Sequence, residues 1–258
     1  MLTGIGTISK LNYTRRNCAI TCFQSTTCLS FNYHVQTQEC QFNTDSPYTK
    51  PLDVLEAPGW ALYHLQRDTD WELVFRAQAN NSLSPYQTWM GNSSPPNPVE
   101  DGCRLMTGTS TCTSIYRSDV LTTWDSESIS EVQLHMYHKG RRVVYIRFNG
   151  TGSTLTNWFS VDRLIDSGWS TMSQSRTFNS FSLKAGSERR FFINQNYGGC
   201  PYDVGWMVVI DIDTNIKPCV WDSMSNRPVF LFAPGEDVTR WIDFVHREAD
   251  VLAVFIKR

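Results

Sequence analysis

Cysteines are the residues of this 258-residue chain whose type and spacing most directly imply chemistry, and four of the eight cluster near its start. They run as C-x3-C-x5-C-x11-C, from Cys18 through Cys22 and Cys28 to Cys40. Zinc sites usually repeat a two-residue gap or add histidine at short spacing, and thiol oxidoreductases also use that gap. Because the cluster has no such gap, we favour structural disulfides and keep zinc and a reactive dithiol as alternatives.

The elements that would position these cysteines follow from the neighbouring residues. Cys18 and Cys22 stand at i and i+4 in TRRNCAITCFQS, so on a helix both sulfurs project from one face. After Cys28, apolar and polar residues alternate through LSFNYH as in a strand, and ECQFNT around Cys40 has the character of a return strand. The pattern predicts a helix cross-linked to a hairpin.

This arrangement resembles the PAN/apple family of small extracellular modules. The resemblance spans residues 1–66 and rests on the four cysteines, on CLSFNY and on the closing aromatic strand GWALYHL. It implies the disulfides Cys18–Cys40 and Cys22–Cys28, whereas spacing alone leaves three pairings open. It also implies a role in recognition. A module of this size has a small core, so each disulfide should stabilise it by about 2–4 kcal/mol.

The other four cysteines are expected to form two short-range cross-links. Cys103 and Cys112 bracket CRLMTGTSTC, and Cys200 and Cys219 flank the apolar run PYDVGWMVVIDIDTNIKP. The even count, divided equally between the two parts of the chain, predicts that every cysteine is paired.

One acidic segment has the outline of a calcium loop. In DIDTNIKPCVWD, the oxygen-bearing residues fall at the first, third, fifth and twelfth positions, and they are Asp211, Asp213, Asn215 and Asp222. However, Ile216 stands where an EF-hand needs glycine, and the last ligand is aspartate instead of glutamate. The competing interpretation is a hairpin tip with solvent-facing acids.

The sequence contains no recognisable catalytic constellation. His135 and His138 would face opposite sides of a strand, so they cannot share a metal ion. We find no G-x-S-x-G, Walker, G-x-G-x-x-G or H-E-x-x-H motif. We therefore expect a protein that is not an enzyme and, calcium apart, has no cofactor.

Aromatic residues are the other chemical resource, since they make up 13% of the chain. Sugars bind where an aromatic face stacks on C–H surfaces and polar groups bind the hydroxyls. Glycine-rich NQNYGGCPYD has the composition of an exposed loop that a partner can approach. The candidate platforms are Trp89, Trp158, Trp169, Tyr197 and Tyr202. Packing in the core is the competing interpretation for each tryptophan.

Composition and sequons indicate the extracellular space. A net charge of −2 gives no electrostatic case for nucleic acid or an anionic membrane, and no apolar run is long enough to span a bilayer. N-linked glycosylation sequons begin at Asn12, Asn80, Asn92 and Asn149. Because MLTGIGTISK is not typical of a signal peptide, we expect a secreted chain or the ectodomain piece of a longer one.

The remaining sequence predicts a mainly β fold. Strand-like segments separated by turns recur from Trp71 onward, and they favour an antiparallel β-sandwich. They are WELVFRA, EVQLHMYH, RRVVYIRFNG, TFNSFSL, RRFFINQ, GWMVVIDI, PVFLFAP and DVLAVFIKR. Two further segments, SVDRLIDSG and DVTRWIDFV, have helical features.

We therefore predict a small α+β PAN/apple-like domain over residues 1–66, a linker over 67–70 and a disulfide-stapled, β-sandwich-like domain over 71–258. The expected function is extracellular recognition or adhesion through a glycan or a protein partner, without catalysis. The alternatives are a structural component of an extracellular matrix and a secreted hydrolase of unfamiliar fold.

Overall fold

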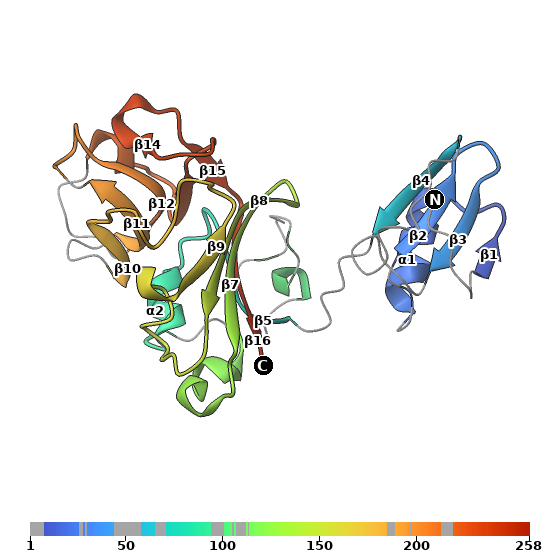
Figure 1. Ribbon diagram of the computed structural model, residues 1–258, viewed down its shortest axis with the longest axis horizontal. Coiled ribbons are helices and arrows are strands. Elements are labelled where there is room, and N and C mark those ends of the chain that lie inside the picture. Colours follow the sequence, from blue (N-terminus) through green and yellow to red (C-terminus); the bar gives the residue numbers. More distant parts are fainter. Residues whose placement is uncertain are drawn as a thin grey trace. The chain divides into compact units, whose positions relative to one another are not determined.

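The structure, a computed structural model, describes residues 8–25, 28, 30–43, 58–64, 71–93, 101–104, 106, 112, 114–184, 189–196, 198–212 and 219–258. It divides the chain into two compact units, Met1–Thr69 and Asp70–Arg258. The predicted linker 67–70 lies outside the described residues. Strands dominate both units (Figure 1).

The first unit is a helix packed on a four-stranded antiparallel sheet. The sheet order is β1-β3-β2-β4, and the elements are β1 Ile8–Lys10, α1 Arg15–Gln24, β2 Ser30–His34, β3 Glu39–Asn43 and β4 Trp60–His64. Thr14 caps the helix by accepting a 3.2 Å hydrogen bond from the backbone N–H of Asn17. Cys18 and Cys22 are fully buried on the helix face that meets the sheet. The predicted helix and hairpin are thus confirmed.

The core of this unit consists of cysteines and aromatic rings. Phe31 and Tyr33 of β2 and Phe42 of β3 pack with the four cysteines, and Phe31 stacks on Tyr63 at 5.0 Å between centroids. On the opposite face of the same strands, polar side chains pair across the ladder. Asn43 Nδ2 donates to Ser30 Oγ at 3.2 Å.

The second unit contains two six-stranded antiparallel sheets. The first sheet has the order β6-β5-β16-β7-β8-β9, with strands β6 Tyr116–Arg117, β5 Glu72–Gln78, β16 Val251–Lys257, β7 Glu131–His138, β8 Arg141–Asn149 and β9 Leu164–Ser167. The second has the order β10-β11-β12-β13-β15, with strands β10 Ser180–Lys184, β11 Arg190–Asn196, β12 Val204–Ile210, β13 Val229–Phe232 and β15 Arg247–Ala249, and with β14 Thr239–Arg240 paired to β12.

Residues of both sheets share one apolar core, which makes this unit a β-sandwich. The first sheet contributes alternate residues such as Leu134 and Ile146, and the second contributes residues such as Ile193 and Met207. A second apolar cluster covers the outer face of the second sheet, where Val208 and its neighbours meet residues from loops. The mainly β fold is as predicted.

Short helices occupy the connections of this unit. They are α2 Pro85–Trp89 and the 3-10 turns η2 Asp101–Arg104, η3 Asp119–Leu121, η4 Trp124–Ser126, η5 Val161–Arg163, η6 Val220–Asp222 and η7 Trp241–Asp243. The helical prediction for SVDRLIDSG is wrong beyond its first turn, because Leu164–Ser167 pairs with β8. In DVTRWIDFV, Thr239–Arg240 pairs with β12 and only Trp241–Asp243 is helical.

Candidate functional site

The four predicted disulfides are all present, and no cysteine is free. The bonds are Cys18–Cys40, Cys22–Cys28, Cys103–Cys112 and Cys200–Cys219. The pairing that the PAN/apple resemblance implied is therefore confirmed. The sulfurs cannot act as zinc ligands or as reactive thiols while they remain in these bonds.

The three candidate tryptophans belong to the core, so their prediction as ligand platforms is corrected. Trp89 and Trp158 have no exposed surface and Trp169 has 4%. Trp89 Nε1 donates to Leu155 O, and Trp169 Nε1 donates to Ala233 O, each at 3.0 Å. Large rings stabilise the sandwich when they lie between its sheets. The indole N–H groups of Trp89 and Trp169 have acceptors there, whereas Trp158 Nε1 is buried with no acceptor among the described residues.

Tyr202 is the predicted platform that reaches the surface, with 62% of its area exposed. Its loop turns at Gly199, whose φ of +91° suits glycine, and Tyr202 N–H donates to Gly199 O at 2.8 Å. The loop is tied at Cys200 to Cys219, with 5.3 Å between the Cα atoms. Tyr197 lies outside the described residues. The tyrosine is thus held on a cross-linked turn.

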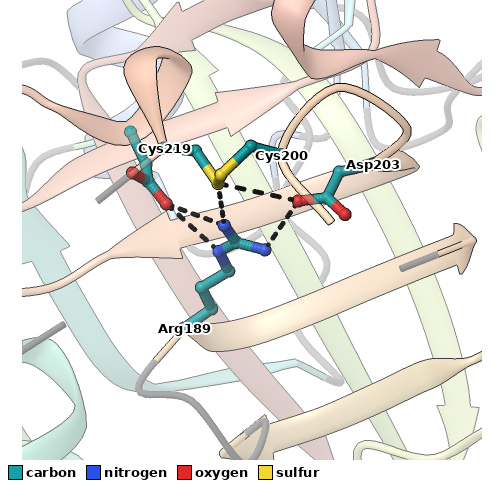
Figure 2. The surroundings of a disulfide bond; sticks show 5 residues. Arg189, Cys200, Asp203 and Cys219 are labelled. Atoms are coloured by element: carbon teal, nitrogen blue, oxygen red, sulfur yellow. Dashed lines mark hydrogen bonds and ion pairs between the residues drawn. A yellow bond between two sulfur atoms is a disulfide. The ribbon is translucent and has the colours of Figure 1, made fainter. Parts of the chain in front are cut away.

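The loop that carries Tyr202 is also held by a buried ion cluster of Arg189, Asp203 and Asp222. Figure 2 shows the Arg189 guanidinium beside the Asp203 carboxylate and against the Cys200–Cys219 disulfide. Nη1 donates to Asp203 Oδ2 at 3.0 Å and Nη2 donates to Asp222 Oδ2 at 2.9 Å. Nη2 also lies 3.1 Å from Cys219 Sγ. The guanidinium lies over the Trp221 ring at 4.2 Å from its centroid, which is cation–π geometry.

The electrostatics of this cluster are dominated by desolvation. Burial raises the pKa of both Asp203 and Asp222, although Arg189 opposes the rise in each case. One guanidinium faces two carboxylates, and the charge of Asp222 adds to the rise in the pKa of Asp203. The carboxylates are engaged by the arginine, which fits an anchoring role for the cluster and not proton transfer to a ligand.

Three loops meet around this anchor and form what we call the loop surface: residues 198–203, 219–222 and 241–246. Trp241 N–H donates to Asp203 O at 3.1 Å, and the rings of Trp221 and Trp241 stack at 5.6 Å. The disulfide joins the first loop to the second. A disulfide, a stacked pair of tryptophans and the Arg189 ion pairs thus connect the loops, and together they hold the loops in place on the outer face of the second sheet.

Exposed apolar side chains gather on the loop surface. Tyr202, Val220, Phe244 and Val245 expose 62%, 71%, 53% and 57% of their areas. Every loop therefore contributes at least one of them. Exposed apolar groups on a rigid frame are a common feature of protein interaction sites, because they bury area without a large loss of entropy.

The calcium prediction is not supported by the ligands that the structure describes. Asp211 is fully buried, and its Oδ2 accepts hydrogen bonds from Ser84 Oγ at 2.9 Å and from Tyr86 N at 3.0 Å. It thereby fixes the start of α2, while Asp222 pairs with Arg189. Asp213 and Asn215 lie outside the described residues. Within the described part of the chain, no group of three acidic, histidine or cysteine side chains could hold a metal ion.

The four sequon asparagines, Asn12, Asn80, Asn92 and Asn149, are all exposed. Their side chains are therefore accessible to modification, and glycosylation stays a prediction. Among the described helices, none is long and apolar enough to cross a membrane.

Sequence reasoning missed Val220, Phe244 and Val245. The sequence predicts a hairpin tip with solvent-facing acids around Val220 and a helix around Phe244 and Val245, and neither pattern marks an exposed apolar side chain. The Arg189 cluster was also missed, because its members lie far apart in sequence and no motif joins them. Only GGCPYD, with its two glycines and a cysteine, carried a local signal of an exposed loop.

The architecture defines the first unit as a small disulfide-stapled module in which one helix covers a four-stranded sheet. Residues 1–66 match the family model of the PAN domain, so this unit is a PAN domain. PAN domains mediate protein–protein or protein–carbohydrate interactions in extracellular proteins. No curated protein and no solved structure matches the chain. The family match does not extend to Asp70–Arg258.

Proposed function

We propose that the protein is an extracellular recognition protein that acts without catalysis, and that its β-sandwich binds a protein partner through the loop surface. The PAN domain and the four disulfides support an extracellular location and a binding role. The observation that carries the assignment to the loop surface is that each of its three loops exposes an apolar side chain, and that a disulfide joins the first two loops while Trp241 packs on both.

The chemistry of the loop surface favours a protein partner. Tyr202 and Phe244 are large and aromatic, and such residues dominate the binding energy of protein interfaces. Their loops are held by buried contacts that do not depend on a ligand, so the surface is in place before the partner arrives. Arg240 and Asp243 are exposed and form an ion pair, with 3.8 Å between Nη1 and Oδ1. Such charges would lie at the polar rim of the contact with a protein partner.

The test uses the whole oxidised chain, immobilised and exposed to native extracellular material. A captured protein is then titrated against Tyr202→Ala, Phe244→Ala and the control Ile165→Ala, which removes a 46% exposed apolar side chain from β9. Each loop-surface variant should weaken binding by about 2 kcal/mol, roughly 30-fold, and the control should change it little.

Two results would count against this function. Equal binding by all three variants would mean that the partner uses another part of the chain. Reversible self-association at micromolar concentration, with no captured partner, would favour a structural role in a matrix.

A further inference from the structure

We propose a second binding site in the β-sandwich: the tip of the β7–β8 hairpin, together with the aromatic residues beside it, binds a glycan that carries carboxylate or sulfate groups. The site lies on the first sheet and uses no residue of the loop surface. It goes beyond the proposed function, because it assigns a different ligand class to a different face. Three observations support it. The arginines of the hairpin tip have no carboxylate partner among the described residues, aromatic rings lie beside the tip, and the basic area does not extend along the sheet.

The hairpin tip concentrates positive charge in a chain whose net charge is −2. Lys139, Arg141 and Arg142 are all exposed, and within the described part of the chain no carboxylate pairs with either arginine. Asp250 is the acidic residue that contacts the tip. It accepts from the backbone N–H of Lys139 and lies 3.4 Å from His138 Nδ1. The two guanidinium groups are therefore available to an anion.

Aromatic rings continue the site along the outer face of the sheet. The Arg142 guanidinium lies 4.9 Å from the centroid of the Tyr145 ring, which fixes it on this face. Tyr145 stands opposite His135 across the ladder, with 5.5 Å between the ring centroids. The imidazole is also 4.9 Å from the ring of Phe255. Tyr137, Tyr145 and Phe255 are half-buried, so the rings form a low platform suited to the C–H face of a sugar.

The charge of Arg142 also acts on the ionisable side chains beside it. His135 is 5% exposed, and its Nδ1 lies 3.0 Å from the hydroxyl of Tyr137. Its Nε2 is buried with no hydrogen-bond partner among the described residues. Arg142 adds to the burial that lowers the pKa of His135, and it opposes the burial that raises the pKa of Tyr137. The imidazole is therefore neutral, and the positive charge beside it comes from Arg142.

The rest of the face limits the class of anion. Further along the strands, Arg147 is paired with Glu131 at 3.3 Å and with Asp166 at 2.8 Å. The positive area is therefore confined to the tip and does not extend into the long basic track that a nucleic acid backbone needs. Val143, 39% exposed, is the one exposed large apolar residue among residues 131–149, which is too little to enter a membrane. A sugar chain with spaced acidic groups fits both limits.

The test measures binding of the full oxidised chain to chondroitin sulfate and to polygalacturonate, with neutral dextran, a single-stranded oligothymidylate and phosphatidylserine vesicles as comparison probes. The expected result is binding to at least one of the acidic polysaccharides and none to dextran. Replacing both arginines (Arg141→Gln with Arg142→Gln) should weaken binding to the acidic polysaccharide about 100-fold. This is about tenfold for each charge-assisted hydrogen bond removed. Both side chains are exposed, so this variant should keep its fold.

Two further variants separate this site from general charge effects. Tyr145→Leu should weaken polysaccharide binding about fivefold and leave its salt dependence unchanged, because it removes a ring and no charge. Arg240→Gln, which removes one exposed charge from a different part of the unit, should change binding less than twofold.

The proposal is overturned if the double arginine variant binds the polysaccharides as well as Arg240→Gln does. Equal binding to dextran, or tighter binding to the oligonucleotide or the vesicles than to either polysaccharide, would also overturn it. Replacement of Tyr202 or Phe244 would not affect these results, so this site and the loop surface can fail separately.

Discussion

His135 should make the β-sandwich less stable as the pH falls, in a range where a solvent-exposed histidine would have no such effect. Burial, followed by the charge of Arg142, lowers the pKa of His135 from 6.5 to about 3. The unfolded chain binds a proton at this histidine near pH 6.5, whereas the folded chain does not do so until about pH 3. The folded state is therefore favoured fully above pH 6.5 and loses that advantage as the pH falls toward 3.

The size of the effect follows from the two pKa values. Their separation corresponds to about 5 kcal/mol when the whole range is crossed, at about 1.4 kcal/mol for each pH unit. At pH 4.5 the histidine of the unfolded chain is protonated and that of the folded chain is still neutral, so about 3 kcal/mol of unfolding free energy is lost relative to pH 8. His135 is 5% exposed, so solvent screening does little to reduce this figure.

The assay is urea unfolding at pH 8, 6 and 4.5 for the wild-type chain and for His135→Gln, followed by tryptophan fluorescence. Apart from Trp60, the tryptophans belong to the β-sandwich, so the signal reports that unit. Carboxylates titrate in both proteins, and the difference between the two curves isolates the histidine. From pH 8 to pH 4.5, the unfolding free energy of the wild type should fall by about 3 kcal/mol more than that of His135→Gln. A difference in unfolding free energy that stays constant with pH would mean that folding does not lower the pKa of His135.

Three further predictions concern the framework. Arg189→Met should destabilise the β-sandwich by about 3–5 kcal/mol at pH 7, because Asp203 and Asp222 lose their arginine partner. The loss should be smaller at pH 4, because burial raises the pKa of both carboxylates and a protonated carboxyl needs no counter-charge. Urea unfolding at both pH values measures this. Gly205→Ala should lower the unfolding free energy of the β-sandwich by about 3 kcal/mol, because the added Cβ would lie 2.6 Å from Ile193 O. An unchanged thermal unfolding midpoint would contradict this prediction. Limited trypsin treatment should cut first at Arg67 and release a PAN domain that stays folded only while oxidised, and mass spectrometry of early fragments tests this.

The strands and the two disulfides of the β-sandwich were predictable because their signals are local. Alternation in EVQLHMYH, for example, places Leu134 and Met136 in the core and His135 on the other face, as the structure shows. The pairing of Cys18 with Cys40 followed from a family resemblance, since spacing left other pairings open. The helix prediction for residues 160–168 was wrong for a physical reason. Leu164–Ser167 forms backbone hydrogen bonds with the edge of β8, and pairing in a sheet outweighs a helix-capping pattern.

The candidate site was predictable only in part. Tyr202 was found because glycines and a cysteine mark its loop. Trp89 and Trp158 were misplaced because composition cannot tell a buried ring from an exposed one, and the space between the sheets decides. The loop surface depends on contacts between segments far apart in the chain, such as Arg189 with Asp222, and these exist only after the sheets have formed.

The most direct test of the recognition function is site-specific photo-cross-linking. A benzophenone side chain replaces Tyr202 in one preparation and Ile165 of β9 in another, and both chains are irradiated in native extracellular material. We expect a discrete protein adduct from position 202 that is absent from position 165 and is suppressed by excess unlabelled wild-type chain. The same adduct from both positions, or adducts that unlabelled chain does not suppress, would contradict the claim that the loop surface binds a protein partner.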